Sequence, residues 1–250
     1  MNEIGFRLRI NFQKRGRLRY LSHLELVRAL ERVIRRAQLP YAISKGFNAH
    51  MRHAPAPALP VGTAGLDEYF DVWLTEYLNP AEALRRLQNA SVKGLDILAV
   101  SYANPRAKGL QATHTREVYE IVLDDGGLGA EEVRARLTRL VESGSLTTAR
   151  QKGGEKIYDL TQMVPRMPKV GEYGDKDGRV CFAPAPAPEA VAPLGSEAAP
   201  VSALLLVTME LRATEQGSIR PKVLLYAALG NDFGWNLRSV TRTRLYGEEG

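Results

Sequence analysis

The sequence has only one cysteine and no long apolar run. That single cysteine, Cys181, excludes an internal disulfide, a zinc site built from several cysteines and an iron–sulfur cluster ligated by this chain's cysteines alone. No apolar stretch approaches the roughly 20 residues that a membrane-spanning helix requires. Residues 1–9 alternate charged and apolar side chains where a secretory signal would have an apolar core. We therefore expect a soluble, cytoplasmic protein that does not act on a membrane.

Motifs for nucleotide hydrolysis and for metal binding are also missing. Neither G-x-G-x-x-G nor G-x-x-x-x-G-K-[ST] occurs, which argues against a nucleotide-hydrolysing enzyme. Among the four histidines, His50 and His53 have the i, i+3 spacing of a metal pair. Arg52 lies between them, and no carboxylate is close in sequence to complete the ligand set. We predict no metal site in this chain.

What the sequence does have is an uneven distribution of charge. Hydrophobic residues make up 44% of the chain and charged residues 25%, an ordinary globular balance. The net charge is +6, but residues 1–115 hold 17 basic against 9 acidic residues, a net +8, so the remainder carries −2. Residues 1–52 alone hold 12 basic against 3 acidic residues. This asymmetry predicts a polyanionic partner, with nucleic acid ahead of a membrane surface.

The first part of the chain predicts alternating strands and helices. Apolar and polar side chains alternate in residues 6–13, the period of a strand with one buried face. Ser22 and Glu25 form a capping box that begins a helix. The predicted elements are strands at 6–13, 41–44, 69–75 and 95–102, and helices at about 22–37 and 79–87. This βαββαβ order is typical of a ferredoxin-like domain, with two helices on one face of an antiparallel sheet.

The same order recurs in the second part once residues 153–202 are set aside. The predicted elements are strands at 118–123, 146–152, 204–212 and 237–246, and helices at 130–143 and 221–229. An Ala/Pro-rich insertion at about 183–199 is expected to be a mobile or extended excursion, because proline prevents regular hydrogen bonding. We therefore predict an α+β protein of tandem ferredoxin-like domains at 1–104 and 116–250, joined by a linker at 105–115.

Basic residues next to a tyrosine form the first candidate nucleic-acid site. Arg15, Arg17 and Arg19 precede Tyr20, and cations beside an aromatic ring offer phosphate neutralisation together with base stacking. Other arginines are weaker candidates. Those of the first predicted helix are expected to form a solvated face: Arg28, Arg32, Arg35 and Arg36. Those of the last predicted strand share one face as a second candidate patch: Arg238, Arg242 and Arg244.

The loop at residues 46–53 is the second candidate site. Glycine, amide, imidazole and guanidinium groups together suit a polyanion cradle. The candidate contacts are Lys45, Asn48, His50 and Arg52. The alternative is an ordinary structured loop whose Phe47 packs into the core. We expect this loop and the first site to converge in one electropositive cleft.

Several sequence blocks resemble the radical-SAM-linked protein family. They are YLSHLELVRALER at 20–32 with Arg35 and Arg36, the residues Gly46, Phe47, Asn48, His50 and Arg52, KIYDL at 156–160, Arg220 with Pro221, and VTRTR at 240–244. Members of this uncharacterised family occur beside, or fused to, a radical SAM protein with a B12-binding-type domain. This sequence departs from the family at Ala49, where members commonly have proline, and in its Ala/Pro tract.

The resemblance implies a radical SAM protein as partner and, through the family's genomic company with RNA-processing and ribosomal genes, an RNA substrate. The iron–sulfur cluster and S-adenosylmethionine are then expected only in the partner, with no cofactor in this chain. The leading hypothesis is a noncatalytic RNA-binding subunit that presents RNA, such as tRNA or rRNA, to a separate radical SAM modifying enzyme.

Two alternatives stay open. The first is a metal-independent RNA endonuclease, with His23 or His50 as general acid or base and Lys45 or Arg52 stabilising the developing charge. The tandem order with an early helix-capping histidine is similar to the repeat-associated RNA-processing endonucleases of CRISPR systems. The second alternative is a protein-interaction adaptor that binds no nucleic acid and meets an acidic partner.

Overall fold

The protein has an α+β fold that divides into two compact units. The computed structural model describes residues 5–45, 47–149, 154–173, 203–214, 217–230 and 237–247. Unit 1 comprises Met1–Thr115 together with Arg242–Gly250, and unit 2 comprises Arg116–Thr241. Among the described helices, none is long and apolar enough to cross a membrane. Cys181 and the Ala/Pro tract at 183–199 lie outside the described residues.

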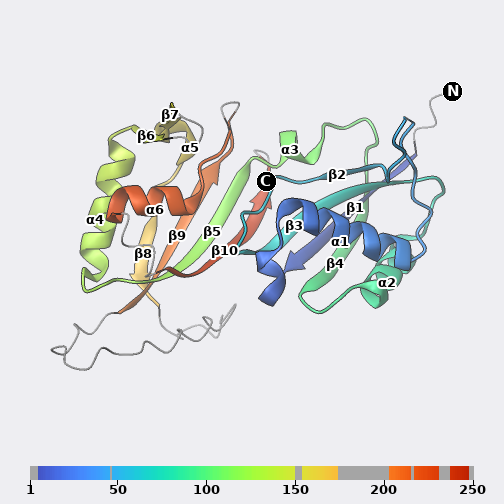
Figure 1. The fold of residues 1–250 in the computed structure, drawn as a ribbon, viewed down its shortest axis with the longest axis horizontal. Coiled ribbons are helices and arrows are strands. Elements are labelled where there is room, and N and C mark those ends of the chain that lie inside the picture. The colour runs from blue at the N-terminus through green and yellow to red at the C-terminus, as the bar shows by residue number, and fades with distance from the viewer. Residues whose placement is uncertain are drawn as a thin grey trace. The chain divides into compact units, whose positions relative to one another are not determined.

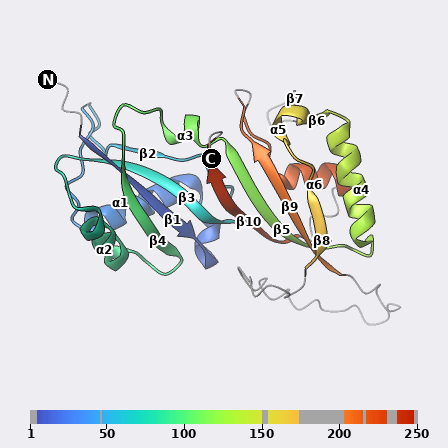
Figure 2. The same ribbon diagram turned by 180° about the vertical axis from the view of Figure 1, so that it is seen from behind.

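Unit 1 is an antiparallel sheet with α1 and α2 on one face (Figures 1 and 2). Its elements are β1 (Phe6–Lys14), the short 3-10 helix η1 (Gly16–Tyr20), α1 (His23–Arg36), β2 (His53–Pro55), β3 (Thr63–Leu74), α2 (Pro80–Ala90), β4 (Leu95–Ala103), α3 (Leu110–Thr113) and the end of β10 (Leu237–Tyr246). β1 pairs antiparallel with both β3 and β4. β2 and β10 are both neighbours of β3.

The alternating pattern of β1 explains how unit 1 forms its core. Leu8, Ile10 and Phe12 are buried in one cluster with apolar residues of α1 and α2. The predicted capping box is present at the start of α1: the Glu25 amide donates to Ser22 Oγ at 3.4 Å, and the Ser22 amide donates to the Glu25 carboxylate at 2.8 Å. These two hydrogen bonds fix the backbone at the start of α1.

Two predictions for unit 1 are wrong. Residues 41–44 make only isolated bridges, Tyr41 to Leu74 and Ile43 to Met51, and the regular strand is β2 further along the chain. Residues 105–115, predicted as a linker, belong to unit 1. Its helix α3 places Leu110 in a small buried cluster with Ala56 and Leu245. A short amphipathic turn of this kind gives too little periodicity to be recognised in a sequence.

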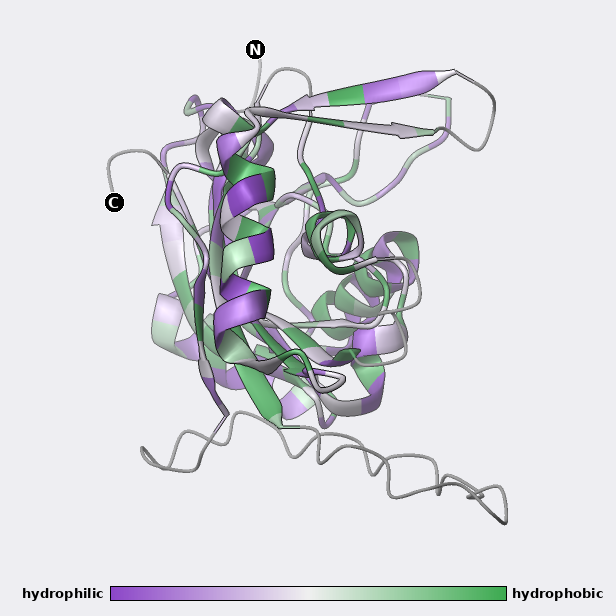
Figure 3. Ribbon diagram, turned by 90° about the vertical axis from the view of Figure 1, so that its left-hand side faces the viewer, coloured by the Kyte–Doolittle hydropathy of each residue, from purple (hydrophilic) through white to green (hydrophobic). Residues whose placement is uncertain are grey.

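Unit 2 is a second antiparallel sheet with its own helices. Figure 3 shows that hydrophilic and hydrophobic stretches alternate along one of them, α4 (Gly129–Glu142). The elements of unit 2 are β5 (Arg116–Asp124), α4 (Gly129–Glu142), β6 (Ser145–Ala149), β7 (Glu155–Asp159), α5 (Leu160–Met163), β8 (Lys169–Glu172), β9 (Leu204–Arg212), α6 (Pro221–Leu229) and the start of β10. The strand order is β10-β5-β9-β8. Val133, Leu137 and Val141 form the buried stripe of α4.

The predicted strand at 146–152 does not join this sheet. β6 pairs with β7 in a separate two-stranded hairpin, and β8 takes the place beside β9. Ser145, Thr147 and Ala149 are exposed, and the residues between them are only partly buried. Leu146 packs against the core of unit 2, but β6 has no fully buried face that would place it in the main sheet.

Candidate nucleic-acid interface

The two predicted groups of binding residues lie at opposite ends of β1. The β1–β3 register pairs Phe6 with Leu74 at one end and Lys14 with Gly65 at the other. η1 follows directly after the Lys14 end, whereas the 44–52 loop is bonded to the opposite end, where the Trp73 amide donates to the Arg52 carbonyl at 3.0 Å. At about 3.3 Å per residue, the two groups are separated by roughly 26 Å. The predicted single cleft is therefore wrong.

The η1 group presents a cation on an aromatic ring. The Arg19 guanidinium carbon lies 4.8 Å from the centre of the Tyr20 ring, and Arg19 Nη2 donates to the Tyr20 hydroxyl at 2.8 Å. Tyr20 is 58% exposed and Arg17 is exposed beside it. Arg15 differs, because its guanidinium donates to Asp96 Oδ2 at 2.5 and 2.9 Å. Arg17, Arg19 and Tyr20 are thus the members of this group that face solvent.

His50 shapes the 44–52 loop through its own hydrogen bonds. Its ring Nδ1 is 3.0 Å from both Ser44 Oγ and the Asn48 carbonyl oxygen, and its amide donates to Ser44 Oγ at 3.1 Å. Lys45, Asn48 and His50 are exposed. Phe47 is also fully exposed, so the alternative in which this ring packs into the core is wrong.

Arg52 is held on the ring of Trp73, an aromatic residue that was not part of the predicted site. Its guanidinium carbon lies 4.7 Å from the centre of the Trp73 ring, and that of Arg7 lies 5.2 Å from the same ring. Arg52 is exposed. Trp73 Nε1 is buried and has no hydrogen-bond partner among the described residues. A fixed guanidinium at the surface suits a phosphate contact, since less side-chain entropy is lost on binding.

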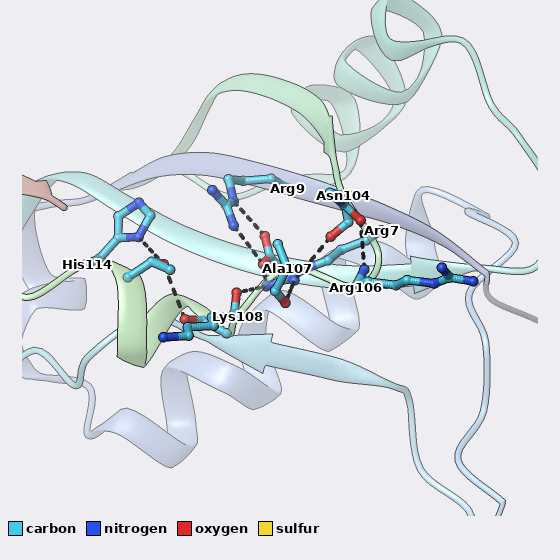
Figure 4. Close-up of polar contacts among 10 residues, drawn as sticks. Arg7, Arg9, Asn104, Arg106, Ala107, Lys108 and His114 are labelled. Carbon is cyan, nitrogen blue, oxygen red and sulfur yellow. Dashed lines mark hydrogen bonds and ion pairs between the residues drawn. The ribbon is translucent and has the colours of Figure 1, made fainter. Parts of the chain in front are cut away.

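Arg7 and Arg9 are engaged in a structural network of polar contacts (Figure 4), and both donate to Asp71. Arg7 Nε donates to Asp71 Oδ2 at 2.8 Å, and Arg9 Nε donates to Asp71 Oδ1 at 2.9 Å. Arg7 also donates to the carbonyls of Ala107 at 2.8 Å and Lys108 at 3.2 Å. The side chain of Arg7 is only 1% exposed. It therefore fixes the 104–108 segment and does not reach an external ligand.

An arginine stripe on α1 lies between the two predicted groups. Arg28, Arg32 and Arg36 recur at i, i+4 and i+8, so they share one side of the helix. All three are exposed and make no ion pair among the described residues. α1 begins shortly after η1 and, at 1.5 Å per residue, is about 21 Å long. The stripe was predicted to be only a solvated face, yet it runs in the direction of the other group.

A buried ionic cluster lies beneath the helices. Lys14 is fully buried and donates to the Leu21 carbonyl at 3.1 Å. Burial lowers its pKa to about 8, and the nearby Glu68 carboxylate only partly offsets this effect. Arg242 Nε donates to Glu68 Oε1 at 2.8 Å, and Arg242 Nη2 donates to the Pro57 carbonyl at 2.9 Å. Arg242, predicted to belong to a surface patch, is fully buried, so that part of the patch is wrong.

The histidines occupy different environments. His23 is the first residue of α1, and burial together with the positive charge of Lys14 lowers its pKa. His53 stacks on Phe70 with ring centres 5.0 Å apart, and its Nε2 is 3.3 Å from Glu31 Oε1. No hydrogen bond joins His23 to His50 in the described part of the chain. Within the same residues, no group of three or more His, Cys, Asp or Glu side chains is placed to hold a metal.

The residues of β3 that contact the basic face of β1 were not identified from the sequence. Asp71 and Trp73 contact Arg7 although they are more than 60 residues away. The available signal was the alternation of Asp67, Tyr69, Asp71 and Trp73, a polar and aromatic face that complements the basic face of β1. The basic alternation in β1 and the acidic and aromatic alternation in β3 together would have predicted that these two strands are neighbours in the sheet.

Comparison with known proteins gives a match to one family model. The family is described as "Uncharacterized protein conserved in bacteria (DUF2344)", and its model matches residues 7–221. No curated protein matches the chain. Among solved structures the chain is similar to one from "Crystal Structure of a Cbf5-Nop10-Gar1 Complex", with a TM-score of 0.44 and 13% identity. That alignment covers 98% of this chain but about half, 51%, of the other, and such a TM-score does not establish a shared fold.

Proposed function

The chain belongs to DUF2344, a family of uncharacterised proteins conserved in bacteria, and from this premise we propose that it is a noncatalytic RNA-binding subunit. It presents RNA, such as tRNA or rRNA, to a separate radical SAM modifying enzyme. The sequence blocks that resemble radical-SAM-linked proteins support the choice of partner. In this proposal the iron–sulfur cluster and S-adenosylmethionine belong to that partner.

The observation that carries the proposal is the set of exposed, unpaired cations in unit 1. Six of the 12 basic residues in 1–52 are exposed and make no ion pair among the described residues: Arg17, Arg28, Arg32, Arg36, Lys45 and Arg52. Residues 1–115 carry +8, and Arg242–Gly250 adds two basic and two acidic residues, so unit 1 holds +8 and unit 2 holds −2. Exposed cations that make no ion pair favour a polyanion, because each can neutralise a phosphate.

We also propose that both units are ferredoxin-like domains. The sheet order is β4-β1-β3 with β2 on the far side of β3 in unit 1, and β10-β5-β9-β8 in unit 2. Numbered within each unit, both orders become 4-1-3-2, which supports two copies of the βαββαβ arrangement. β6, β7 and α5 then form an insertion in the second copy. Four-stranded sheets of this kind are common carriers of RNA-binding surfaces.

The test of RNA binding is the salt dependence of affinity. We expect the full chain to bind single-stranded RNA with log K falling linearly against log salt, by about 0.7 for each phosphate contact. Affinity would be measured by fluorescence anisotropy between low and physiological salt. Copurification from the native host, with sequencing of bound RNA and mass spectrometry of bound proteins, identifies the RNA and the partner. Absence of RNA binding, with capture of an acidic protein, would favour the adaptor alternative.

One observation favours the endonuclease alternative, and a cleavage assay separates it from the proposal. His23 and Glu68 line the same small hollow, and burial lowers the pKa of His23, which favours the neutral imidazole that a general base requires. We expect no RNA cleavage by the wild type, with or without EDTA, and the same result for His23→Ala and His50→Ala. Metal-free cleavage that either substitution abolishes would replace the binding subunit with a nuclease.

A further inference from the structure

Three aromatic side chains form an exposed cluster in unit 1. The rings of Tyr77 and Tyr102 are stacked with centres 5.2 Å apart and planes at 26°. Phe6 meets both rings edge-on, at 5.8 Å from Tyr77 and 6.1 Å from Tyr102. Tyr77 is 61% exposed and Phe6 is 41% exposed. The cluster therefore leaves a large part of two aromatic rings in water although the core of unit 1 is otherwise well buried.

Two hydrogen bonds fix the Tyr102 ring of the cluster. The Tyr102 hydroxyl donates to the Leu78 carbonyl at 2.8 Å and accepts from the Leu78 amide at 3.0 Å. This double contact fastens the connection between β3 and α2 to β4 and holds Tyr77 against the Tyr102 ring. A fixed ring with an open face binds a flat ligand at low cost in conformational entropy.

The segment that precedes Tyr77 is hydrogen-bonded to the segment that follows α1. The Thr75 amide and hydroxyl both donate to the Pro40 carbonyl, at 2.7 and 3.1 Å. Tyr77 thus follows two residues after a contact with the segment that leaves α1. In the last turn of α1 the Arg35 guanidinium carbon lies 5.9 Å from the centre of the Tyr41 ring, and its Nη2 is 3.5 Å from Glu31 Oε2. Arg36, at the end of the helix, is exposed. Exposed cations and exposed rings therefore both occur in unit 1, and the Thr75–Pro40 contact joins the segments that follow α1 and precede α2.

We propose that Tyr77, supported by Tyr102 and Phe6, is a stacking platform for an unpaired nucleobase of single-stranded RNA whose phosphates follow the α1 arginines. This inference rests on the proposed RNA-binding function and specifies the substrate class as single-stranded. Stacking on an open aromatic face tolerates any base, since every base has a π face. A duplex keeps its bases stacked internally and gains nothing from the platform.

The experiment compares RNA ligands that differ only in their bases. Wild type and Tyr77→Ala full-length protein are titrated with a 12-nucleotide oligouridine, with the same strand made abasic, and with a 12-base-pair RNA duplex. Loss of the platform should weaken oligouridine binding about tenfold, without changing the salt slope, because stacking of one base is removed and no phosphate contact is lost. Affinity for the abasic strand and the duplex should be the same in both proteins.

Two further variants serve as controls. Tyr77→Phe keeps the π face and should bind oligouridine as the wild type does. Leu98→Ala removes an exposed apolar side chain of unit 1 that is 43% exposed and lies on β4, and it should have no effect. Because Tyr77 is mainly exposed, thermal melting of Tyr77→Ala should match the wild type.

Each contrary result has a distinct meaning. Salt-dependent oligouridine binding that Tyr77→Ala leaves unchanged would overturn the platform and leave the RNA-binding function in place. An equal loss for the abasic strand would also overturn it, because the effect would not be stacking. Binding of an oligoproline peptide that is lost in Tyr77→Ala, with oligouridine unaffected, would assign the rings to a proline-rich partner. Absence of all RNA binding by the wild type would overturn the function together with the platform.

Discussion

The stability of unit 1 is expected to depend strongly on one buried aspartate, which binds two arginines. Asp71 is fully buried and accepts hydrogen bonds from Arg7 and Arg9. We expect Asp71→Asn to lower the free energy of unfolding by about 3 to 5 kcal/mol, because the buried Arg7 charge loses its carboxylate. Asp96→Asn is the matched control. It removes the partner of Arg15, whose side chain is 40% exposed, and should cost less than about 1 kcal/mol. Urea unfolding of both variants measures the difference, and equal losses would contradict the assignment.

Lys14 alone is expected to make the free energy of unfolding depend on pH. Burial lowers its pKa from 10.5 to about 8. Between these pH values the unfolded chain binds more protons at this site than the folded chain, so the free energy of unfolding rises as pH increases from 8 to 10.5. Below pH 8 the folded protein bears the full cost of the buried charge.

We therefore expect Lys14→Met to remove the rise between pH 8 and 10.5 and to raise the free energy of unfolding at pH 7, because the cost of the buried charge is removed. Urea titrations at pH 7, 8 and 10 measure both effects. A variant that keeps the wild-type dependence in this window would show that another group is responsible.

At the scale of the element, α1 is expected to carry RNA phosphates along its arginine stripe. Replacing Arg28, Arg32 and Arg36 together by alanine should lower the slope of log K against log salt by about 2, at about 0.7 for each phosphate. Arg52→Ala should lower it by about 0.7. Arg85→Ala is the control on α2, since Arg85 is ion-paired with Glu82 at 2.7 Å. A slope that responds to Arg52 but not to the α1 variant would place the RNA away from this helix.

The elements that could be predicted are those whose apolar residues recur with a clear helical or strand periodicity. The helix beginning at Ser22 has a capping box and a buried stripe, and β1 alternates regularly, so both were found. The strand at 41–44 and the linker at 105–115 were wrong because contacts distant in sequence decide those segments. Residues 53–55, and not 41–44, form the strand that pairs with β3. Residues 104–108 are held to unit 1 by hydrogen bonds from Arg7 to their carbonyl groups.

The candidate site was predictable in its residue types but not in its arrangement. Basic residues beside aromatic rings were identified at Tyr20, and the structure places Arg19 on that ring. The distance between the two groups depends on the β1–β3 register, which a sequence without an identified partner strand does not specify. The aromatic cluster at Tyr77 was missed because its three rings are far apart in the sequence.

At the scale of the whole molecule, the chain returns to unit 1 at its far end. Arg242 is fully buried and paired with Glu68, from which it is separated by 174 residues. We expect Arg242→Ala to destabilise unit 1 by about 3 to 5 kcal/mol, because the buried Glu68 carboxylate loses this guanidinium. Arg244→Ala, which removes an exposed arginine on the same strand, should change stability by less than about 1 kcal/mol. Hydrogen exchange would show whether the loss is confined to unit 1, and equal effects of both variants would contradict this role.

The return of the chain has a consequence for biosynthesis. A ribosome that adds roughly 5 to 20 residues per second needs about 10 to 35 s to proceed from Glu68 to Arg242, 174 residues later. During that interval the nascent polypeptide carries Lys14 and Glu68 without the guanidinium that accompanies them in the finished protein. All of unit 2 is translated within the same interval. Unit 1 is therefore begun before unit 2 and completed after it, and its buried Glu68 carboxylate lacks its guanidinium until unit 2 has been translated.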